Sequence, residues 1–282
     1  MATVYLGTSP YAAAILRRLA QSPHRPALVV TRPDRPAGRG RQLVSPPVAD
    51  AARELGIAIA QPEELGAPEV RAQILELEPS AVIVCAYGVL IREPLLSDFE
   101  LLNVHPSLLP RWRGAAPIER AIMAGDTQTG VSIMRLTEGL DSGPVCLSAT
   151  EPIRADDTFG TLSARLERLG GDLLIRALDE PRTFIDQDEA HVTYAEKIRA
   201  EDRLLDPGMG TQERERIVRA LQPHIGARIA LPGGAFLGVL RAHTDGDRLV
   251  LDEVKPPGGR AMAFDDFAHG HPALAAALEA GA

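Results

Sequence analysis

The chain has 282 residues, and 45 % of them are hydrophobic, which is enough for one large domain or two modest ones. It has no run of 18 or more apolar residues and no basic region ahead of an apolar start, which argues against a membrane span and a signal peptide and favours a cytoplasmic enzyme. The net charge of -8 disfavours a general nucleic-acid binder, and two distant cysteines, Cys85 and Cys146, give little support to a disulfide framework or a metal site.

Short apolar segments alternate with helix-length segments through the first part of the chain. The predicted strands are residues 3–6, 27–31, 57–60 and 80–85, and the helices between them are residues 12–21, 47–55 and 68–76. This alternation predicts an α/β fold with a doubly wound, mostly parallel sheet, whose ligands bind beyond the carboxyl ends of the strands. The first turn, residues 7–10, lacks the pattern G-x-G-x-x-G, which disfavours a nicotinamide or flavin cofactor.

The rest of the chain divides into the end of this domain, a connector and a smaller module. Further strands are predicted at residues 101–104, 131–136 and 145–149, with helices at 116–124 and 158–178. They complete a first domain at residues 1–187. The polar segment 188–208 suits a surface connector. In residues 209–282, a helix at 212–221 precedes hairpins around Gly233-Gly234 and Asp245-Gly246, which predict a small, OB-like β-barrel.

Candidate catalytic residues stand at the end of the strand at 101–104. Asn103 and His105 fall on one face because side chains alternate along a strand, and Pro106 should end the strand at the ligand-binding edge. Asp141 lies in a loop rich in glycine and proline that follows the next strand. An amide, an imidazole and a carboxylate without a nucleophilic serine or cysteine suit direct attack by an amine on an activated acyl carbon. The same residues could instead cap turns, and their spacing does not decide between the two.

The segment Arg32–Arg41, RPDRPAGRGR, is a concentrated positive stretch in an acidic chain. It holds four arginines against one aspartate. Its prolines limit the entropy of the loop, and its glycines permit close approach to a large partner. It is therefore the first candidate for contact with an anionic partner, although such runs are usually solvated loops.

A longer sequence match favours the functional interpretation of these residues. Residues 102–145, LNVHPSLLPRWRGAAPIERAIMAGDTQTGVSIMRLTEGLDSGPV, closely resemble the folate-dependent formyltransferases. The same family pattern occurs in VYLGTSPYAA near the start, TRPDRPAGRGRQL at 31–43, AYGVLI at 86–91 and VTYAEKIRAED at 192–202. The resemblance covers both expected domains and is weakest after residue 208.

The resemblance implies a reaction and its participants. It implies transfer of a formyl group from 10-formyltetrahydrofolate, without a metal, to an amine, with initiator methionyl-tRNA as the expected acceptor and translation initiation as the process served. It puts Asn103, His105 and Asp141 in the family's catalytic positions. The implied folate contacts are Val89, Leu90, Ile91, Ser107, Leu108 and Asp141, and the implied tRNA contacts are Arg35, Arg39 and Arg41. A monomer with a tRNA-binding C-terminal module is expected.

Other functions remain open at this stage. A nucleotide-amino-sugar N-formyltransferase is the stronger rival because it too joins such a catalytic domain to a short C-terminal module. A formyl-folate hydrolase would share the three catalytic residues but usually carries an N-terminal regulatory domain, for which we expect no room here. A noncatalytic RNA-binding or oxidoreductase module could use the same sheet, since fold alone never fixes function.

Overall fold

The computed structural model describes residues 2–37 and 42–280. They form two compact units that interleave along the chain. The first unit comprises Met1–Arg113, Gly130–Glu151 and Ala164–Tyr194, and the second comprises Gly114–Thr129, Pro152–Ser163 and Ala195–Ala282.

The first unit contains a seven-stranded sheet in the order β10-β9-β7-β6-β1-β2-β5. The strands are β1 (Thr3–Gly7), β2 (Leu28–Val30), β5 (Ala58–Ala60), β6 (Ala81–Cys85), β7 (Leu101–His105), β9 (Gln128–Arg135) and β10 (Val145–Pro152). Pairing is parallel from β5 through β2, β1 and β6 to β7, whereas β7 and β9 are antiparallel. The predicted doubly wound, mostly parallel sheet is confirmed.

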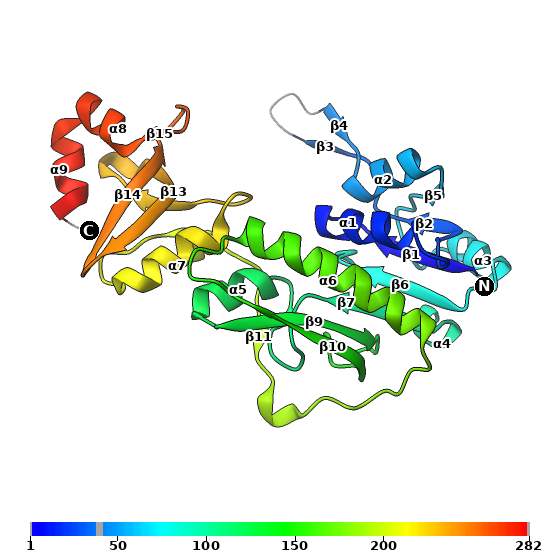
Figure 1. Cartoon of the computed structure of the whole chain (residues 1–282). Coiled ribbons are helices and arrows are strands. Elements are labelled where there is room, and N and C mark those ends of the chain that lie inside the picture. Colours follow the sequence, from blue (N-terminus) through cyan, green and yellow to red (C-terminus); the bar gives the residue numbers. More distant parts are fainter. Residues whose placement is uncertain (1, 38–41, 281–282) are drawn as a thin grey trace. The chain divides into compact units, whose positions relative to one another are not determined.

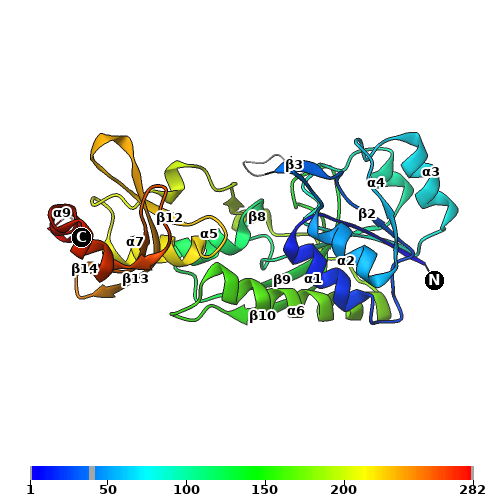
Figure 2. The ribbon, with the colours of Figure 1, turned by 90° about the horizontal axis from the view of Figure 1, so that it is seen from above.

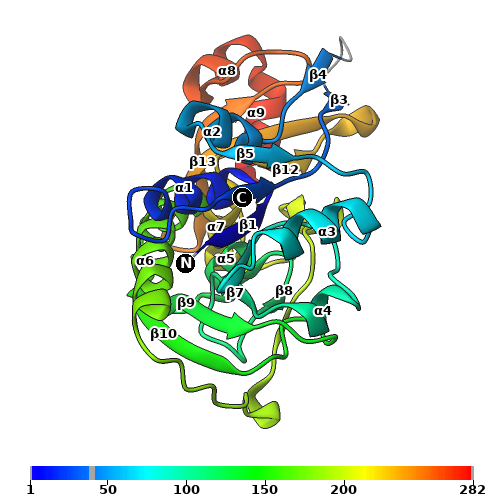
Figure 3. The same ribbon diagram turned by 90° about the vertical axis from the view of Figure 1, so that its right-hand side faces the viewer.

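Helices cover both faces of this sheet because its central strands are apolar on both sides. Val4 and Leu6 of β1 belong to a core that includes Ile74 of α3 (Pro68–Glu76) and Leu95 of α4 (Leu95–Asp98). On the other face, the hydroxyl of Tyr5 donates to the carbonyl of Ala12 in α1 (Pro10–Leu19). Figure 3 shows α1 and α6 (Phe159–Asp179) on one side of the sheet and α3 and α4 on the other.

The helices begin and end where local chemistry dictates. α1 starts after Ser9, whose hydroxyl accepts a hydrogen bond from the Ala12 amide. α2 (Pro47–Leu55) begins with a proline and ends at Gly56, whose φ of 66° suits a residue without a side chain. Figure 2 shows α1 and α2 side by side, in agreement with their direct contact. The predicted bounds of α2 and α3 match the observed ones.

The second unit is built on a separate antiparallel sheet in the order β12-β13-β14-β15. These strands are β12 (Ala227–Ala230), β13 (Phe236–Asp245), β14 (Arg248–Lys255) and β15 (Met262–Ala263), and the helices are α5 (Pro117–Ala124), α7 (Thr211–Leu221), α8 (Phe264–Gly270) and α9 (Pro272–Ala280). Leu221, Leu237 and Phe267 meet in its core. Figure 1 shows α8 beside β14, and the two elements are in contact. The C-terminal β module, which was predicted as a small OB-like barrel, is confirmed as a separate antiparallel sheet.

Some elements were not predicted. Strand β3 (Arg35–Ala37) lies in the segment expected to form a loop, and it pairs in antiparallel fashion with β4 (Gln42–Val44), for which no strand was predicted. Helices α8 and α9 lie in a part of the chain for which no helix was predicted. The expected connector 188–208 contains the short strand β11 (Tyr194–Ala195), which pairs with β8 (Arg113–Gly114).

Candidate active site

Strand β7 carries two of the predicted catalytic side chains. It runs between β6 and β9 and ends at His105, directly before Pro106, which has no amide hydrogen to continue the ladder. Asn103 is 8 % exposed and His105 is 4 % exposed. A strand interior rarely accommodates buried polar side chains without partners, so their contacts define this end of the sheet.

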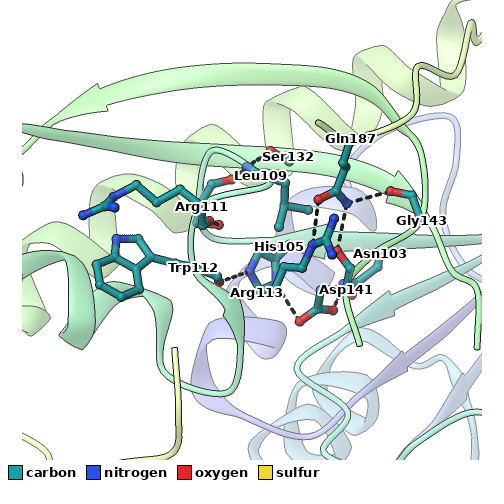
Figure 4. Close-up of polar contacts among 11 residues, drawn as sticks. Asn103, His105, Leu109, Arg111, Trp112, Arg113, Ser132, Asp141, Gly143 and Gln187 are labelled. Carbon is teal, nitrogen blue, oxygen red and sulfur yellow. Dashed lines mark hydrogen bonds and ion pairs between the residues drawn. The ribbon is translucent and has the colours of Figure 1, made fainter. Parts of the chain in front are cut away.

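Asp141 joins these two side chains from the turn between β9 and β10. Its Oδ2 lies 3.6 Å from Nδ1 of His105, and its Oδ1 lies 3.5 Å from Nδ2 of Asn103 (Figure 4). The Asp141 backbone has a φ of 46°, a left-handed conformation that aspartate tolerates better than most residues. The structure therefore brings together the three residues that the sequence singled out.

The backbone after β7 orients the His105 ring. Its Nε2 lies 2.8 Å from the carbonyl oxygen of Trp112, as Figure 4 shows. A carbonyl can only accept, so Nε2 carries a hydrogen and donates it. Trp112 has a φ of 65°, an uncommon conformation for a bulky residue. The result is that Nδ1 faces Asp141, and a proton taken up there forms an imidazolium beside a carboxylate.

Ser107 and Leu108 belong to the turn that follows. The Ser107 hydroxyl donates to the carbonyl of Arg111 at 2.6 Å, and the Ser107 carbonyl accepts from the Ser132 hydroxyl at 2.8 Å. The Leu108 side chain lies against Gly130, where an added Cβ would come within 2.6 Å of it. The side chain of Ser107 is thus engaged with the protein backbone.

Val89, Leu90 and Ile91 lie in the loop after β6. Val89 is 45 % exposed and Leu90 is 56 % exposed, whereas Ile91 is only 6 % exposed. All three line a pocket of about 360 Å³, whose other lining residues include Arg32, Tyr87 and Arg92. The three predicted catalytic residues are not among those that line it. Burial raises the pKa of Tyr87, although the nearby Arg32 opposes this.

Only one of the three arginines expected to contact tRNA can be placed. Arg35 lies on β3, and its guanidinium forms an ion pair with the exposed carboxylate of Glu63. Arg39 and Arg41 lie outside the described residues.

Sequence reasoning missed two residues of this site, Gln187 and Arg113. The Gln187 amide nitrogen donates to the carbonyl oxygens of Asp141 at 2.8 Å and Gly143 at 2.7 Å. Arg113 is buried, and its Nε donates to the Gln187 side-chain oxygen at 2.9 Å. Arg113 lies inside the segment 102–145 that carried the resemblance, but Gln187 stands in an irregular segment where no pattern marks it.

The site suits acyl transfer without a covalent enzyme intermediate. Cys85, at the end of β6, is fully buried, and burial raises its pKa to about 12, so it supplies no thiolate near neutral pH. Among residues 2–37 and 42–280, no three His, Cys, Asp or Glu side chains gather in a way that could hold a metal ion. Every helix in these same ranges is too short or too polar to cross a bilayer.

Comparison with known proteins gives the family. Residues 1–178 match the family model described as formyl transferase. The methionyl-tRNA formyltransferase of Halorhodospira halophila is 42 % identical over an alignment of 297 positions, gaps included, which covers 95 % of each chain.

Two solved structures share the fold at low sequence identity. A methionyl-tRNA formyltransferase from Clostridium thermocellum superposes with a TM-score of 0.64 at 13 % identity, covering 91 % of this chain and 99 % of that one. A sugar 3N-formyl transferase, WlaRD, gives a TM-score of 0.63 at 14 % identity over 88 % of each chain. The fold is thus common to enzymes with different acceptors, whereas the identity over nearly the whole length is to a methionyl-tRNA enzyme. The chain belongs to the formyl transferase family and, within it, to the methionyl-tRNA formyltransferases.

Proposed function

We propose that this protein transfers the formyl group of 10-formyltetrahydrofolate to the α-amine of initiator methionyl-tRNA, in the cytoplasm and in support of translation initiation. The observation that carries this proposal is the meeting of Asn103, His105 and Asp141 at the end of β7, in a chain of this family. The alternative acceptor, a nucleotide-linked amino sugar, is supported only by a shared fold.

In the proposed reaction, the neutral amine attacks the formyl carbon, a C–N bond forms and negative charge develops on the formyl oxygen. Asn103 donates an amide hydrogen to that oxygen. The attacking amine loses a proton, the bond from the formyl carbon to the folate nitrogen breaks, and this nitrogen takes up a proton. His105 carries the proton through Nδ1, and Asp141 stabilises the transient imidazolium. The products are formylmethionyl-tRNA and tetrahydrofolate.

The folate would lie along two backbone segments of the first unit. Val89, Leu90 and Ile91 are proposed to meet the pterin ring through backbone groups, and the pocket that these residues line supports this assignment. Ser107, Leu108 and Asp141 are proposed to complete the site. Ser107 is fully buried, and its hydroxyl, its amide and its carbonyl are all bonded within the protein, so we expect it to support the folate site by holding the turn in place.

The tRNA would be recognised by the arginine-rich segment and by the C-terminal module. Arg35, Arg39 and Arg41 are proposed to contact the acceptor stem through phosphates and base edges. We further propose a functional division into a catalytic domain (1–187), a linker (188–208) and a tRNA-binding domain (209–282), acting as a monomer. The compact units interleave along the chain, so this division describes function and not packing.

The acceptor can be tested directly. The purified protein is incubated with 10-formyltetrahydrofolate and, separately, charged initiator tRNA, nucleotide-linked amino sugars or water alone. We expect formylmethionyl-tRNA as the product. A formylated sugar without formylated tRNA would overturn the acceptor, and release of formate alone would indicate a hydrolase.

In the same assay, Arg39→Leu should raise KM for the tRNA by about tenfold, the loss expected for one charge-assisted contact, and leave KM for the folate unchanged. The control is Arg176→Leu, which removes an exposed arginine from α6 and should change neither constant. Equal losses for both substrates in Arg39→Leu would contradict a role in tRNA binding.

A further inference from the structure

The turn that carries Asp141 joins the paired strands β9 and β10 and is tightly constrained. Asp141 has a left-handed φ of 46°, and an added Cβ on Gly143 would lie 1.8 Å from the carbonyl oxygen of Arg135. Between Arg135, at the end of β9, and Gly143, just before β10, the chain reverses its direction. The two carbonyl groups of Asp141 and Gly143 both point toward the same amide, that of Gln187 (Figure 4).

Gln187 comes from a distant part of the sequence that is itself anchored to β10. The amides and carbonyls of Val145 and Ile185 exchange hydrogen bonds of 2.9 Å in both directions. Two residues later, Gln187 reaches across to the Asp141 turn. Its side chain therefore links the backbone of that turn to a segment that lies more than 40 residues later in the chain.

The orientation of the Gln187 amide follows from its partners. Arg113 is a donor only, so the group that it meets at 2.9 Å must be the amide oxygen. The two backbone carbonyls are acceptors only, so the group that they meet must be the amide nitrogen. No other rotamer of the amide satisfies all three contacts.

Arg113 is itself fixed. Its side chain is 3 % exposed, and its two terminal nitrogens lie 2.7 Å and 3.3 Å from the carboxylate oxygens of Glu189. These bonds lower the pKa of Glu189, which favours the ionised partner at neutral pH. The chain of contacts runs from Glu189 through Arg113 and Gln187 to the backbone of Asp141.

The contacts of the Asp141 carboxylate depend closely on the position of its turn, because both of them are already long. It lies 3.6 Å from the His105 ring and 3.5 Å from the Asn103 amide. A further shift of about 1 Å would break both contacts, and misplacement of this size can cost about 100-fold in rate.

We infer that Gln187 is a positioning residue for formyl transfer, which fixes the Asp141 turn through two amide hydrogen bonds while Arg113 fixes Gln187. This inference rests on the proposed function and deepens it. Gln187 touches no reacting atom. It acts by holding Asp141 at the distance that lets the carboxylate stabilise the protonated His105.

The test is Gln187→Glu, which keeps the size of the side chain and its bond to Arg113. It replaces the NH₂ group, which donates two hydrogen bonds, by a charged carboxylate oxygen, which can only accept. We expect kcat to fall by about 10- to 100-fold with both KM values preserved and the fold intact. The matched control is Gln73→Glu, which makes the same chemical change on the exposed side of α3 and should leave kcat within twofold. Wild-type kcat in Gln187→Glu would overturn the inference.

A double variant separates positioning from general stability. If Gln187 acts through Asp141, then Gln187→Glu should cost less than twofold when added to Asp141→Asn, because the group that it positions is already disabled. Losses that multiply in the double variant would overturn the inference.

A second readout does not depend on the acceptor. In protein labelled with ¹⁵N-histidine, the Nδ1 resonance of His105 should move in Gln187→Glu and stay in place in Gln73→Glu. If the wild-type protein formylates no tRNA, the proposed acceptor fails, while this resonance still decides whether Gln187 controls the contact between Asp141 and His105. An unmoved resonance would overturn the inference.

Discussion

At the scale of single residues, Asn103 and His105 both contact the Asp141 carboxylate, but their side chains differ in what they can do chemically. Asn103 is a neutral donor that keeps its hydrogens, whereas His105 can gain and lose a proton. Nε2 of His105 is committed to the Trp112 carbonyl at 2.8 Å, so only Nδ1 is available for exchange. The amide is thus suited to stabilise charge and the imidazole to move a proton.

Asn103→Ala tests the charge-stabilising role. Loss of one oxyanion donor typically costs about 10²- to 10³-fold in kcat, and we expect a loss in this range. The side chain is small and its one described bond, to Asp141, is 3.5 Å long, so the thermal midpoint should shift by only a few degrees. Single-turnover rates with saturating folate measure the effect. Near wild-type rates in a folded variant would exclude Asn103 from the reaction.

Residue-scale prediction from the sequence succeeded where a local rule applied. The two-residue period of a strand and the stop at Pro106 were sufficient to pair Asn103 with His105. Asp141 was a candidate because of its loop rich in glycine and proline, but no local rule predicts its approach to His105, which stands 36 residues earlier in the chain. Gln187 could not be found, since its contacts with the Asp141 turn are with backbone carbonyls, which leave no trace in the identities of their residues.

At the scale of elements, the turn between β9 and β10 depends on the absence of a side chain at Gly143. The obstacle there is space: an added Cβ would lie 1.8 Å from a backbone oxygen that belongs to the end of β9. Backbone cannot move aside as a flexible side chain can. A larger residue at this position must therefore push the whole turn, and Asp141 with it.

We accordingly expect Gly143→Ala to lower kcat by at least tenfold and the free energy of unfolding by about 1–3 kcal/mol, the usual cost of overpacking. The control is Gly270→Ala at the end of α8, where an added Cβ meets nothing within 4 Å. Steady-state kinetics and urea unfolding measure the two effects. A fully active Gly143→Ala would show that the turn tolerates displacement.

Helices and strands were predictable to the extent that their patterns are local. The bounds of α2 and α3 follow from proline at the first turn and from apolar spacing, and Gly56 marks the end of α2. The hairpin of β3 and β4 was missed because RPA and QLV lack the apolar alternation of a strand. Its pairing arises from contact between segments, which sequence patterns of this length do not encode.

At the scale of the whole molecule, the two compact units do not follow the order of the chain. The segments 114–129 and 152–163 pack with the C-terminal residues although they lie between parts of the first unit in sequence. The sequence predicted two successive modules because composition changes near residue 190. Long-range packing of α5 against α7 could not be foreseen from either helix alone.

Ion pairs make the stability of the molecule depend on pH. Arg120 in α5 binds Asp202 through both carboxylate oxygens, at 3.1 Å and 2.8 Å, and the Arg199 amide donates to the same carboxylate at 2.8 Å. Burial alone would raise the pKa of Asp202, but these hydrogen bonds outweigh it and lower the pKa below the ordinary value of 3.8. The pKa of Asp98 is likewise lowered, by its hydrogen bonds from Arg71.

A carboxyl group whose pKa is lower in the folded state stabilises the fold above its unfolded pKa, and this stabilisation is lost as pH falls through the folded value. Asp202→Asn should therefore lower the free energy of unfolding by about 1–2 kcal/mol at pH 7, and its difference from the wild type should shrink as the pH falls below about 4. Asp247→Asn, at an exposed position of the same unit, should follow the wild type throughout. Urea unfolding from pH 3 to pH 7 measures all three. A difference that stays constant with pH would mean that the Asp202 charge contributes nothing and that only its shape matters.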